Sequence, residues 1–223
     1  MKRVPYEEMV AQFARVLEKK GFLLVDSGAT YMDGTTDITR TYPLGPLTED
    51  EKRFYTWTLQ SHIDLAKAVW LDYCECKMID TIAREPLWRH LINYRCGTGH
   101  SVSFVGNVHE GPHALNSRNT TRMRPGMVVT DEPGVYETDL VGIRIENELV
   151  CVHKADNQYG TFLGFEPLMF VPIATSPILP GVLDKDEIAW LNDYHRQVFA
   201  KLAPHLNDEE RSWLAEKCAA IGC

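Results

Sequence analysis

Residues 21–41 carry the pattern of two β-strands. Residues 21–28, GFLLVDSG, form an apolar run that predicts a buried strand. Asp33-Gly34 is a tight-turn signal, and it is followed by the alternating residues Thr36, Ile38 and Arg40. The sequence therefore predicts a β-hairpin that turns at Asp33-Gly34.

Helical spacing near the N-terminus predicts a short amphipathic helix over residues 6–20. Met9, Phe13 and Leu17 would lie on one side of it. Gly21 follows directly and is a typical residue after the end of a helix.

Capping signals mark the longer predicted helices. Thr48 with Glu51 forms a capping box ahead of a long segment of helical spacing. A second helix is expected over Met78–Ile92, although Pro86 must bend or break it. Two more capping pairs predict helices at the C-terminus, namely Asp184 with Glu187 and Asn207 with Glu210.

The order of these elements indicates the fold class. Residues 100–175 return to strand-like segments, so the order is strands, helices, strands, helices. This order predicts an α+β fold with an antiparallel or mixed sheet rather than alternating βαβ units. With 223 residues, 44% of them hydrophobic, the chain can bury a substantial core. No repeat, low-complexity tract or linker divides it, so we expect residues 1–223 to form a single domain.

Composition excludes several classes of partner. The net charge of −8 argues against nucleic acid, because such binding depends on Lys and Arg that neutralise phosphates. The most apolar segment, residues 168–183, is interrupted by prolines, so we expect no membrane span. The sequence has no apolar signal core near its start and no CxxC pair. We therefore expect a cytoplasmic protein whose 6 cysteines are reduced thiols.

Four carboxylates and one histidine stand in segments built like active-site segments. They are Asp26, Asp37, His100, Glu132 and Glu146. Carboxylate oxygens suit hard cations such as Mn²⁺, and a single imidazole adds selectivity for transition metals. Two cations about 3.5–4 Å apart need bridging ligands, which such a set can supply. The pattern therefore indicates a two-metal hydrolase site.

The local geometry of two of these segments needs explanation. If Ile143–Glu148 is a strand, its charged residues share one face, its isoleucines point into the core, and the buried acidic face requires cations. In a flat hairpin, Asp26 and Asp37 share a face but stand about four residues apart, too far to hold one metal pair. A bulge, for which Gly28 is the candidate, is therefore expected.

Several motifs occur in an order and at a spacing that resemble the pita-bread metallopeptidases, family M24. They are VDSGATYMDGTTDITRT, GTGH followed by NVHEGP, VVTDEPGVYE, GIRIENE and FEPLMFVPI. Within that family the chain is most similar to the catalytic domain of the cytosolic type of aminopeptidase P, or Xaa-Pro aminopeptidase. The resemblance implies a pita-bread α/β fold, with a curved antiparallel sheet flanked by helices.

The resemblance also implies roles for the candidate ligands. Asp26 would bind one metal, Asp37 and Glu146 would bridge both metals, and His100 and Glu132 would bind the other. The metals would be two Mn²⁺, with Zn²⁺ or Co²⁺ as substitutes. A hydroxide that bridges them would attack the carbonyl of the first residue while Glu132, in a catalytic role, handles its proton. The substrate would be a peptide with proline in second position.

Two further side chains belong to the implied site. His109 would contact the substrate and take part in catalysis. Arg144 is a candidate substrate contact too, but we favour a role in which it holds Glu146 or Glu132 in place. His113 is close to the site without an assigned role, and the other histidines are expected in the core or on the surface.

The chain departs from the family pattern at several places. No histidine precedes His62, so the segment that carries the family's upstream substrate histidine is missing, as are the N-terminal domains. Cys96, which we expect to be a plain thiol of the pocket wall, stands where the family has histidine; Ser101 and Ser103 replace glycines. We therefore expect an N-terminally truncated catalytic domain that keeps its metals more surely than its turnover. Apolar surface left uncovered predicts a homodimer.

Three alternatives stay open. A prolidase-like dipeptidase would share the metal ligands but would refuse peptides longer than two residues. A catalytically weakened peptide-binding protein would keep the fold and bind proline-containing peptides without releasing an amino acid. A fragment of a split enzyme would receive its upstream part from another chain.

Overall fold

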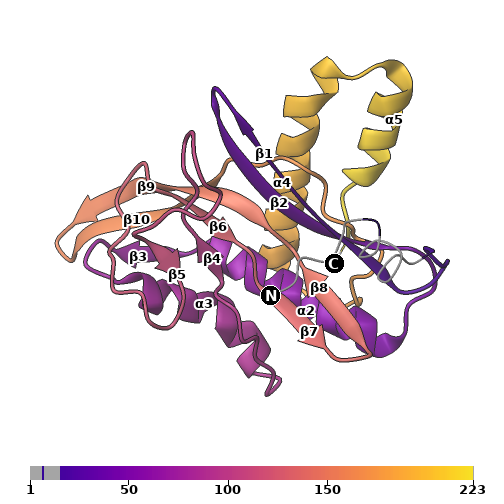
Figure 1. Cartoon of the computed structure of the whole chain (residues 1–223), viewed down its shortest axis with the longest axis horizontal. Coiled ribbons are helices and arrows are strands. Elements are labelled where there is room, and N and C mark those ends of the chain that lie inside the picture. The colour runs from indigo at the N-terminus through magenta and orange to yellow at the C-terminus, as the bar shows by residue number, and fades with distance from the viewer. Residues whose placement is uncertain (1–6, 8–15, 223) are drawn as a thin grey trace.

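The computed structural model describes Glu7 and residues 16–222 (Figure 1). Its strands are β1 (Phe22–Tyr31), β2 (Gly34–Pro43), β3 (Val69–Leu71), β4 (Gly99–His100), β5 (Ala114–Leu115), β6 (Val128–Asp131), β7 (Gly134–Glu137), β8 (Val141–Arg144), β9 (Asn147–Asn157) and β10 (Gly160–Pro167). Its helices are α2 (Glu49–Ala66), α3 (Cys76–Trp88), α4 (Lys185–Leu202) and α5 (Asp208–Lys217), with a 3₁₀ turn, η1 (Ala203–His205).

The described strands pair in antiparallel fashion throughout. Strands β3, β10, β9 and β6 form a sheet in that order, and β1–β2, β4–β5 and β7–β8 form separate two-stranded pairs. In Figure 1 helices α2 and α3 run below the β1–β2 hairpin and below β9 and β10, while α4 and α5 rise beside the hairpin. This arrangement confirms the prediction of an α+β fold with antiparallel strands rather than βαβ units.

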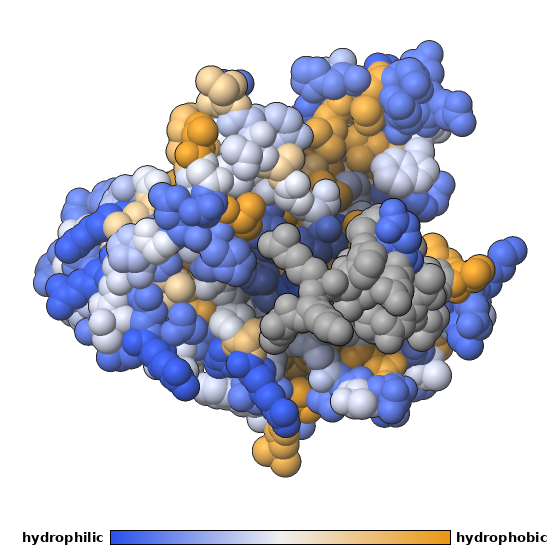
Figure 2. All heavy atoms as spheres, in the orientation of Figure 1, coloured by the Kyte–Doolittle hydropathy of each residue, from blue (hydrophilic) through white to orange (hydrophobic). Residues whose placement is uncertain are grey.

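The predicted hairpin is confirmed, but its turn falls at Met32-Asp33, one residue before the predicted Asp33-Gly34. Strands β1 and β2 pair over their whole length, and Tyr31 lies opposite Gly34 across the turn. The hairpin projects from the body of the molecule, and its tip shows apolar atoms at the surface (Figure 2). Met32 at the turn is 87% exposed.

The predicted bulge at Gly28 is wrong, because the register of this hairpin is unbroken. Gly28 lies opposite Asp37, so Asp26 and Asp37 are two residues apart along one face rather than four. A Cβ atom at Gly28 would lie 2.8 Å from the carbonyl oxygen of Thr36. The close approach of the two strands therefore explains the glycine, and a shorter offset replaces the bulge.

A buried arginine fastens the hairpin to the rest of the fold. Arg40 on β2 is 3% exposed and donates to oxygen atoms from several segments of the chain. The acceptors are the carbonyl oxygens of Thr39, Glu146, Val171 and Pro172 and the side-chain oxygens of Asn147 and Tyr194. The guanidinium group has five N–H donors in a fixed fork, which suits a site with many acceptors.

Two apolar clusters hold the helices against the strands. The first joins α2 and α3 to β9 and β10, and the second joins α2 and α4 to β8. Burying one large aliphatic side chain in such a cluster contributes about 1.5–3 kcal/mol. His195 of α4 is fully buried beside the second cluster, where its Nε2 atom accepts from the backbone N–H of Ile173 at 3.1 Å.

The predicted capping boxes are confirmed at Thr48, Asp184 and Asn207, the residues before α2, α4 and α5. In each, the cap side chain accepts from the backbone N–H three residues on, and the Glu there accepts from the cap's own backbone N–H. The four first N–H groups of a helix lack partners within it, so such local exchange fixes where each helix begins.

Two helix predictions need correction. Helix α3 runs from Cys76 to Trp88 rather than from Met78 to Ile92, and Pro86 is accommodated near its end. The predicted helix over residues 6–20 is wrong for residues 16–20, which have irregular structure. Its other apolar positions, Met9 and Phe13, lie outside the described residues.

The remaining compositional expectations can be checked in part. Cys74, Cys76, Cys96, Cys151 and Cys218 are free thiols. Within the described ranges no helix is both long enough and apolar enough to cross a membrane.

We predict that Arg40→Lys lowers the free energy of unfolding by about 3 kcal/mol or more. A lysine ammonium has fewer donors than a guanidinium, so several buried oxygens would lose their partner, at about 1–3 kcal/mol each. Urea unfolding of both proteins measures the difference. Arg53→Lys on exposed α2 surface is the matched control, and equal losses in the two variants would contradict the bracing role of Arg40.

We predict that His195 makes the fold sensitive to acid. Burial and the neighbouring Arg40 lower the pKa of His195 from 6.5 to about 4. The folded state thus holds the neutral ring, and stability present above pH 6.5 is lost as the pH falls through about 4. His195→Gln, which keeps a hydrogen-bond acceptor, should flatten the pH dependence of the unfolding free energy over this range. A His205→Gln control that flattened it equally would refute the assignment.

Candidate metal centre

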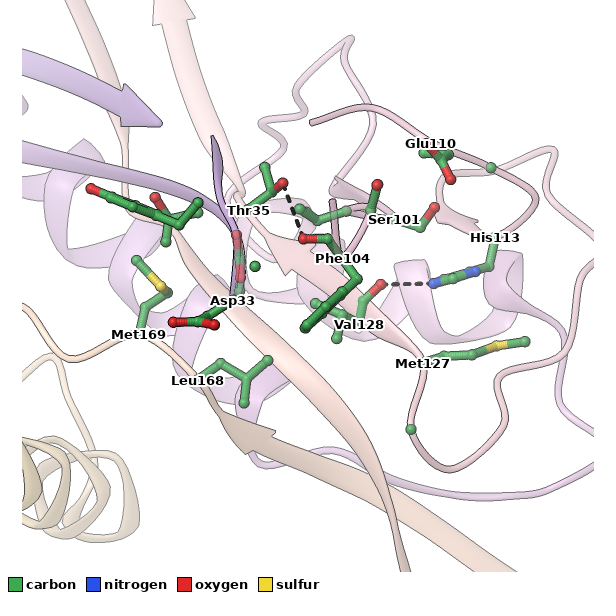
Figure 3. A pocket seen from close by; sticks show the side chains of 18 residues that line it. Asp33, Thr35, Ser101, Phe104, Glu110, His113, Met127, Val128, Leu168 and Met169 are labelled. Carbon is green, nitrogen blue, oxygen red and sulfur yellow. Dashed lines mark hydrogen bonds between the residues drawn. The ribbon is translucent and has the colours of Figure 1, made fainter. Parts of the chain in front are cut away.

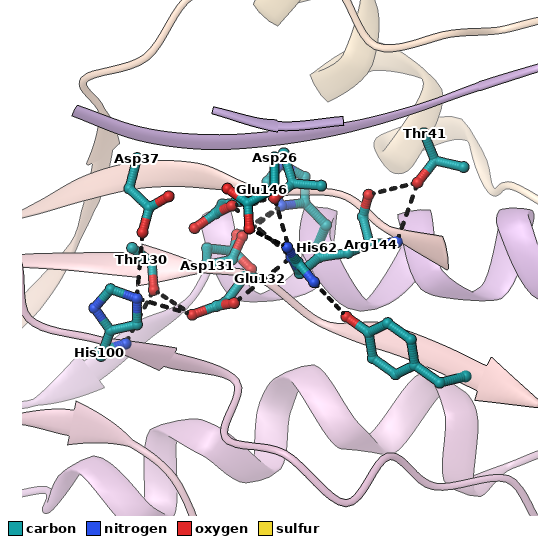
Figure 4. A network of polar contacts seen from close by, with 12 residues as sticks. Asp26, Asp37, Thr41, His62, His100, Thr130, Asp131, Glu132, Arg144 and Glu146 are labelled. Carbon is teal, nitrogen blue, oxygen red and sulfur yellow. Dashed lines mark hydrogen bonds and ion pairs between the residues drawn. The ribbon is translucent and has the colours of Figure 1, made fainter. Parts of the chain in front are cut away.

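Three of the predicted ligands meet in the folded chain. Asp37 on β2, His100 on β4 and Glu146 between β8 and β9 place one potential ligand atom each within 4.8 Å of one another. The elements that carry them are far apart in the sequence, and Figure 4 shows their side chains converging below the hairpin. The fold therefore assembles the cluster that the motifs only suggested.

Glu132 adjoins this cluster through His100. The Nε2 atom of His100 lies 3.2 Å from Oε1 of Glu132 and 3.4 Å from Oδ2 of Asp37. Thr130 accepts the backbone N–H of His100 at 2.9 Å and donates its hydroxyl to Glu132 at 3.0 Å. A single threonine on β6 thus fixes the histidine and the glutamate relative to each other.

Asp26 lies at the other end of the cluster, where Arg144 connects it to the remaining carboxylates. Arg144 pairs with Asp26 through Nη2, and its Nε atom is 3.8 Å from Glu132 and 4.0 Å from Glu146. The same guanidinium donates to the hydroxyl of Tyr136 at 2.7 Å. These contacts agree with a role for Arg144 in holding the acidic residues in place.

Glu146 is the most deeply buried acid of the cluster. Its side chain is 1% exposed, and burial, followed by the charges of Glu132 and Asp37, raises its pKa to about 8. Oε2 accepts from the hydroxyl of Thr39 at 2.5 Å, whereas Oε1 has no hydrogen-bond partner in the part of the chain described. A buried carboxylate oxygen without a partner is costly unless a cation meets it.

The electrostatics of His100 point the same way. Burial lowers the pKa of His100, but hydrogen bonds to Asp37 and Glu132 outweigh that effect and raise it to about 10. The carboxylates of the cluster thus carry more negative charge than His100 and Arg144 can neutralise. Carboxylates around a single imidazole are a donor set for Mn²⁺, Zn²⁺ or Co²⁺, so these residues fit divalent metals.

An interruption between strands β8 and β9 directs the side chain of Glu146 toward the cluster. Strand β8 ends at Arg144 and β9 begins at Asn147, so residues 143–148 do not form the single strand considered for them. The backbone N–H of Glu146 donates instead to the Thr39 carbonyl at 3.1 Å, which ties the break to the hairpin. Ile143 before the break and Ile145 within it are fully buried, as expected for the core face.

The residues with predicted substrate roles line the same site. The ring of His109 stacks on that of His100, with centroids 3.6 Å apart and planes inclined by 19°.

Cys96 as a whole residue is exposed, but its thiol is partly buried. This burial, followed by the charge of Glu132, raises the pKa of the thiol and so disfavours the thiolate that metals bind. His62 is fully buried and pairs with Asp131 at 3.1 Å, in agreement with a core role.

Sequence reasoning missed three residues that shape the site. They are Thr39, Thr130 and Tyr136, of which the threonines are buried. The buried side of β2 carries Thr35, Asp37, Thr39 and Thr41, so the period of two residues that starts from Asp37 is the signal that could have found Thr39. Thr130 stands two residues before Glu132, but its contact with the backbone of His100 spans 30 residues and no local pattern indicates it.

A carboxylate cluster around one imidazole fits divalent metals, and two-metal sites occur in hydrolases such as phosphatases and aminopeptidases. Residues 6–153 match the sequence profile of metallopeptidase family M24, and residues 161–221 match that of the C-terminal region of peptidase M24. The chain belongs to metallopeptidase family M24.

Two plant relatives match most of the chain. Aminopeptidase P1 of Lotus japonicus is 40% identical over 95% of this chain and 33% of its own length. Aminopeptidase P2 of Arabidopsis thaliana is 43% identical over 95% of this chain and 30% of its own length. The chain thus spans about a third of the length of these curated relatives.

Solved structures give the same picture. An X-prolyl aminopeptidase from Caenorhabditis elegans, described as a cytosolic enzyme with a di-nuclear active site, superposes with a TM-score of 0.84 at 40% identity, over 89% of this chain and 33% of its own. The prolidase from Pyrococcus furiosus reaches a TM-score of 0.57 at 29% identity, over 67% of this chain and 41% of its own. These neighbours confirm the pita-bread fold and the resemblance to aminopeptidase P.

We predict that Asp37→Asn loses bound metal and the thermal stabilisation that metal gives. At a free Mn²⁺ concentration of about 100 times Kd, binding to the folded state alone should raise the Tm of the unmodified protein by about 5–10 °C. Metal analysis after dialysis and a thermal melt with and without Mn²⁺ measure both effects. Asp156→Asn, at the exposed end of β9, is the control with the same charge change. Full metal content in Asp37→Asn would sink the assignment.

Proposed function

We propose that this chain is the catalytic part of a metal-dependent aminopeptidase that releases the first residue from peptides with proline in second position. The observation that carries the proposal is the convergence of Asp37, His100 and Glu146, with Glu132 adjoining, in a chain 40% identical to aminopeptidase P over most of its length. Because the chain spans a third of these relatives, activity of the chain by itself is part of the proposal.

Five side chains would hold two cations. Asp26 would bind one, His100 and Glu132 the other, and Asp37 and Glu146 both. The partnerless Oε1 of Glu146 and the excess negative charge support this set. We take the metal to be Mn²⁺, with Zn²⁺ or Co²⁺ as substitutes. When bound, such cations lower the pKa of a water molecule and polarise a peptide carbonyl.

The protein groups around that position have distinct tasks. Glu132, held by the Thr130 hydroxyl at 3.0 Å, would accept the proton released by the attacking water and pass it to the leaving proline nitrogen. His109, whose ring lies against His100, would hold the substrate carbonyl and stabilise its developing negative charge. Arg144 would keep Glu132 and its neighbours oriented, as its contacts in the structure suggest.

Assembly and location belong to the same proposal. We propose that residues 1–223 act as one catalytic domain, that it forms a homodimer, and that it works in the cytoplasm. Exposed apolar side chains such as Met32 and Trp213 supply contact area for a second copy. The description of the nematode relative as cytosolic supports the location.

We predict slow, Mn²⁺-dependent release of the first residue from Arg-Pro-Pro. Cys96 replaces a substrate-side histidine, so turnover should be weak, and Cys96→His should raise it. His109→Ala should lower the rate by about a hundredfold with metal content unchanged, because it removes a contact to the reacting group. Amino acid release followed by chromatography measures the rates. His153→Ala serves as the control, because His153 is exposed and its ion-pair partner is the surface residue Asp156.

The same assay separates the alternatives. A dipeptidase would cleave Arg-Pro and leave Arg-Pro-Pro intact. A peptide-binding protein, fully metal-loaded, would bind Arg-Pro-Pro and release nothing above a metal-ion blank. That last result would replace the enzyme with a binding module.

A further inference from the structure

A pocket of about 780 Å³ borders the candidate metal centre. It lies between the tip of the β1–β2 hairpin, the loop after β4 and the start of β6 (Figure 3). Thr35, which lines it, lies on the same buried face of β2 as Asp37, and Ser101, which also lines it, follows His100 in the chain. A peptide held at the metal centre can therefore send a side chain into this pocket.

Three polar atoms on the pocket wall are buried without hydrogen-bond partners among the described residues. They are Oε1 of Glu148, Oγ of Ser101 and Nδ1 of His113. These side chains belong to residues only 4%, 2% and 8% exposed, so solvent does little to satisfy them. Leaving such atoms unpaired costs free energy, which indicates a ligand that pairs with them.

The missing partner is a donor. Nε2 of His113 donates to the carbonyl of Val128 at 2.7 Å, so in the neutral ring Nδ1 is an acceptor (Figure 3). Both oxygens of an ionised Glu148 accept only, and the hydroxyl of Ser101 can accept as well. A group with several N–H donors would satisfy all three, as a guanidinium or an ammonium can.

Charge and shape favour a cation with an apolar stem. The pocket is lined by the acidic residues Asp33, Glu110 and Glu148, and none of the described residues on its wall is a lysine or arginine. Apolar side chains, among them Phe104 and Leu168, form much of the remaining wall (Figure 3). Arg and Lys side chains combine a cationic head with an aliphatic stem, and so fit both features.

A metal ion fits this pocket less well. In the described part of the chain, the group of potential metal ligands that lie close enough together is Asp37, His100 and Glu146, without Glu148 or His113. Glu148 and His113 thus lie outside the close group of potential metal ligands, and their acceptor atoms suit an organic cation with several N–H donors.

We propose that this pocket selects a basic first residue, Arg or Lys, with Glu148 as the specificity-determining side chain. The inference rests on the proposed aminopeptidase function. Two side chains flank the bond to be cut, and the second belongs to proline, whose uncharged ring gains nothing from a buried carboxylate. The first residue is therefore the one whose side chain Glu148 can recognise.

The test compares Arg-Pro-Gly, Leu-Pro-Gly and Gly-Pro-Arg on the Mn²⁺-loaded protein, by calorimetric affinity and by release of the first residue. We expect Arg-Pro-Gly to be favoured over Leu-Pro-Gly by about tenfold or more, as for a charge-assisted contact in a buried site. Glu148→Gln, which keeps the shape, should bring this ratio close to one with metal content unchanged. Glu209→Gln on exposed α5 has the same charge change and should keep the ratio.

A second variant guards against loss of the metal centre in Glu148→Gln. Ser103→Lys places a competing ammonium on the pocket wall and leaves Glu148 and every proposed metal ligand in place, and it should also abolish the preference for arginine. Arginine preference that survives both variants, equal treatment of Arg-Pro-Gly and Leu-Pro-Gly, or a preference for Gly-Pro-Arg would each overturn the inference. Selective binding of Arg-Pro-Gly without turnover would support the pocket while refuting the proposed enzyme function.

Discussion

The burial of Arg40 is the interaction on which the rest of the site depends. Its guanidinium joins the hairpin to the break before β9, to residues 171–172 and to α4, all through carbonyl, amide and phenol oxygens. Neighbours along a strand point to opposite faces, so Arg40 anchors one face of β2 while Asp37, three residues earlier, faces the cluster. The hairpin carries two of the five proposed ligands, and Arg40, together with the bonds between Thr39 and Glu146, holds it in position relative to Glu146.

The opposite face of the hairpin has the reverse charge balance. Carboxylates gather there around Arg144 and His100, and the buried Glu146 keeps one oxygen without a partner. For the stability of the fold alone, an apolar side chain at this position would be more favourable, because burying a charged group costs free energy. The retention of Glu146 near the hydrogen-bonded Arg40 indicates that the stability lost at the cluster is offset elsewhere, as at functional sites in general.

What the sequence predicted well was local. The capping boxes at Thr48, Asp184 and Asn207 depend on residues three positions apart. The hairpin is signalled by the adjacent residues Asp33 and Gly34, although its turn falls one residue earlier, at Met32-Asp33. What it missed depends on distant contacts. The strand break that turns Glu146 toward the cluster is stabilised by a hydrogen bond to Thr39, more than a hundred residues earlier, and no local pattern announces it.

The offset between Asp26 and Asp37 depends on where the hairpin turns, and a shift of the turn by one residue removes the need for a β-bulge. The hairpin closes over a turn with Tyr31 opposite Gly34, which brings the two acids within two residues in register and removes any need for a bulge. That register also decides what lies beyond the acids, because it places Thr35 beside Phe104 and so closes the hairpin tip over the loop after β4. The pocket that reaches Glu148 is thus a consequence of the same turn that positions the proposed metal ligands. The proposed recognition and the proposed chemistry would then share one geometric origin, and the side chains on the pocket wall would set specificity independently.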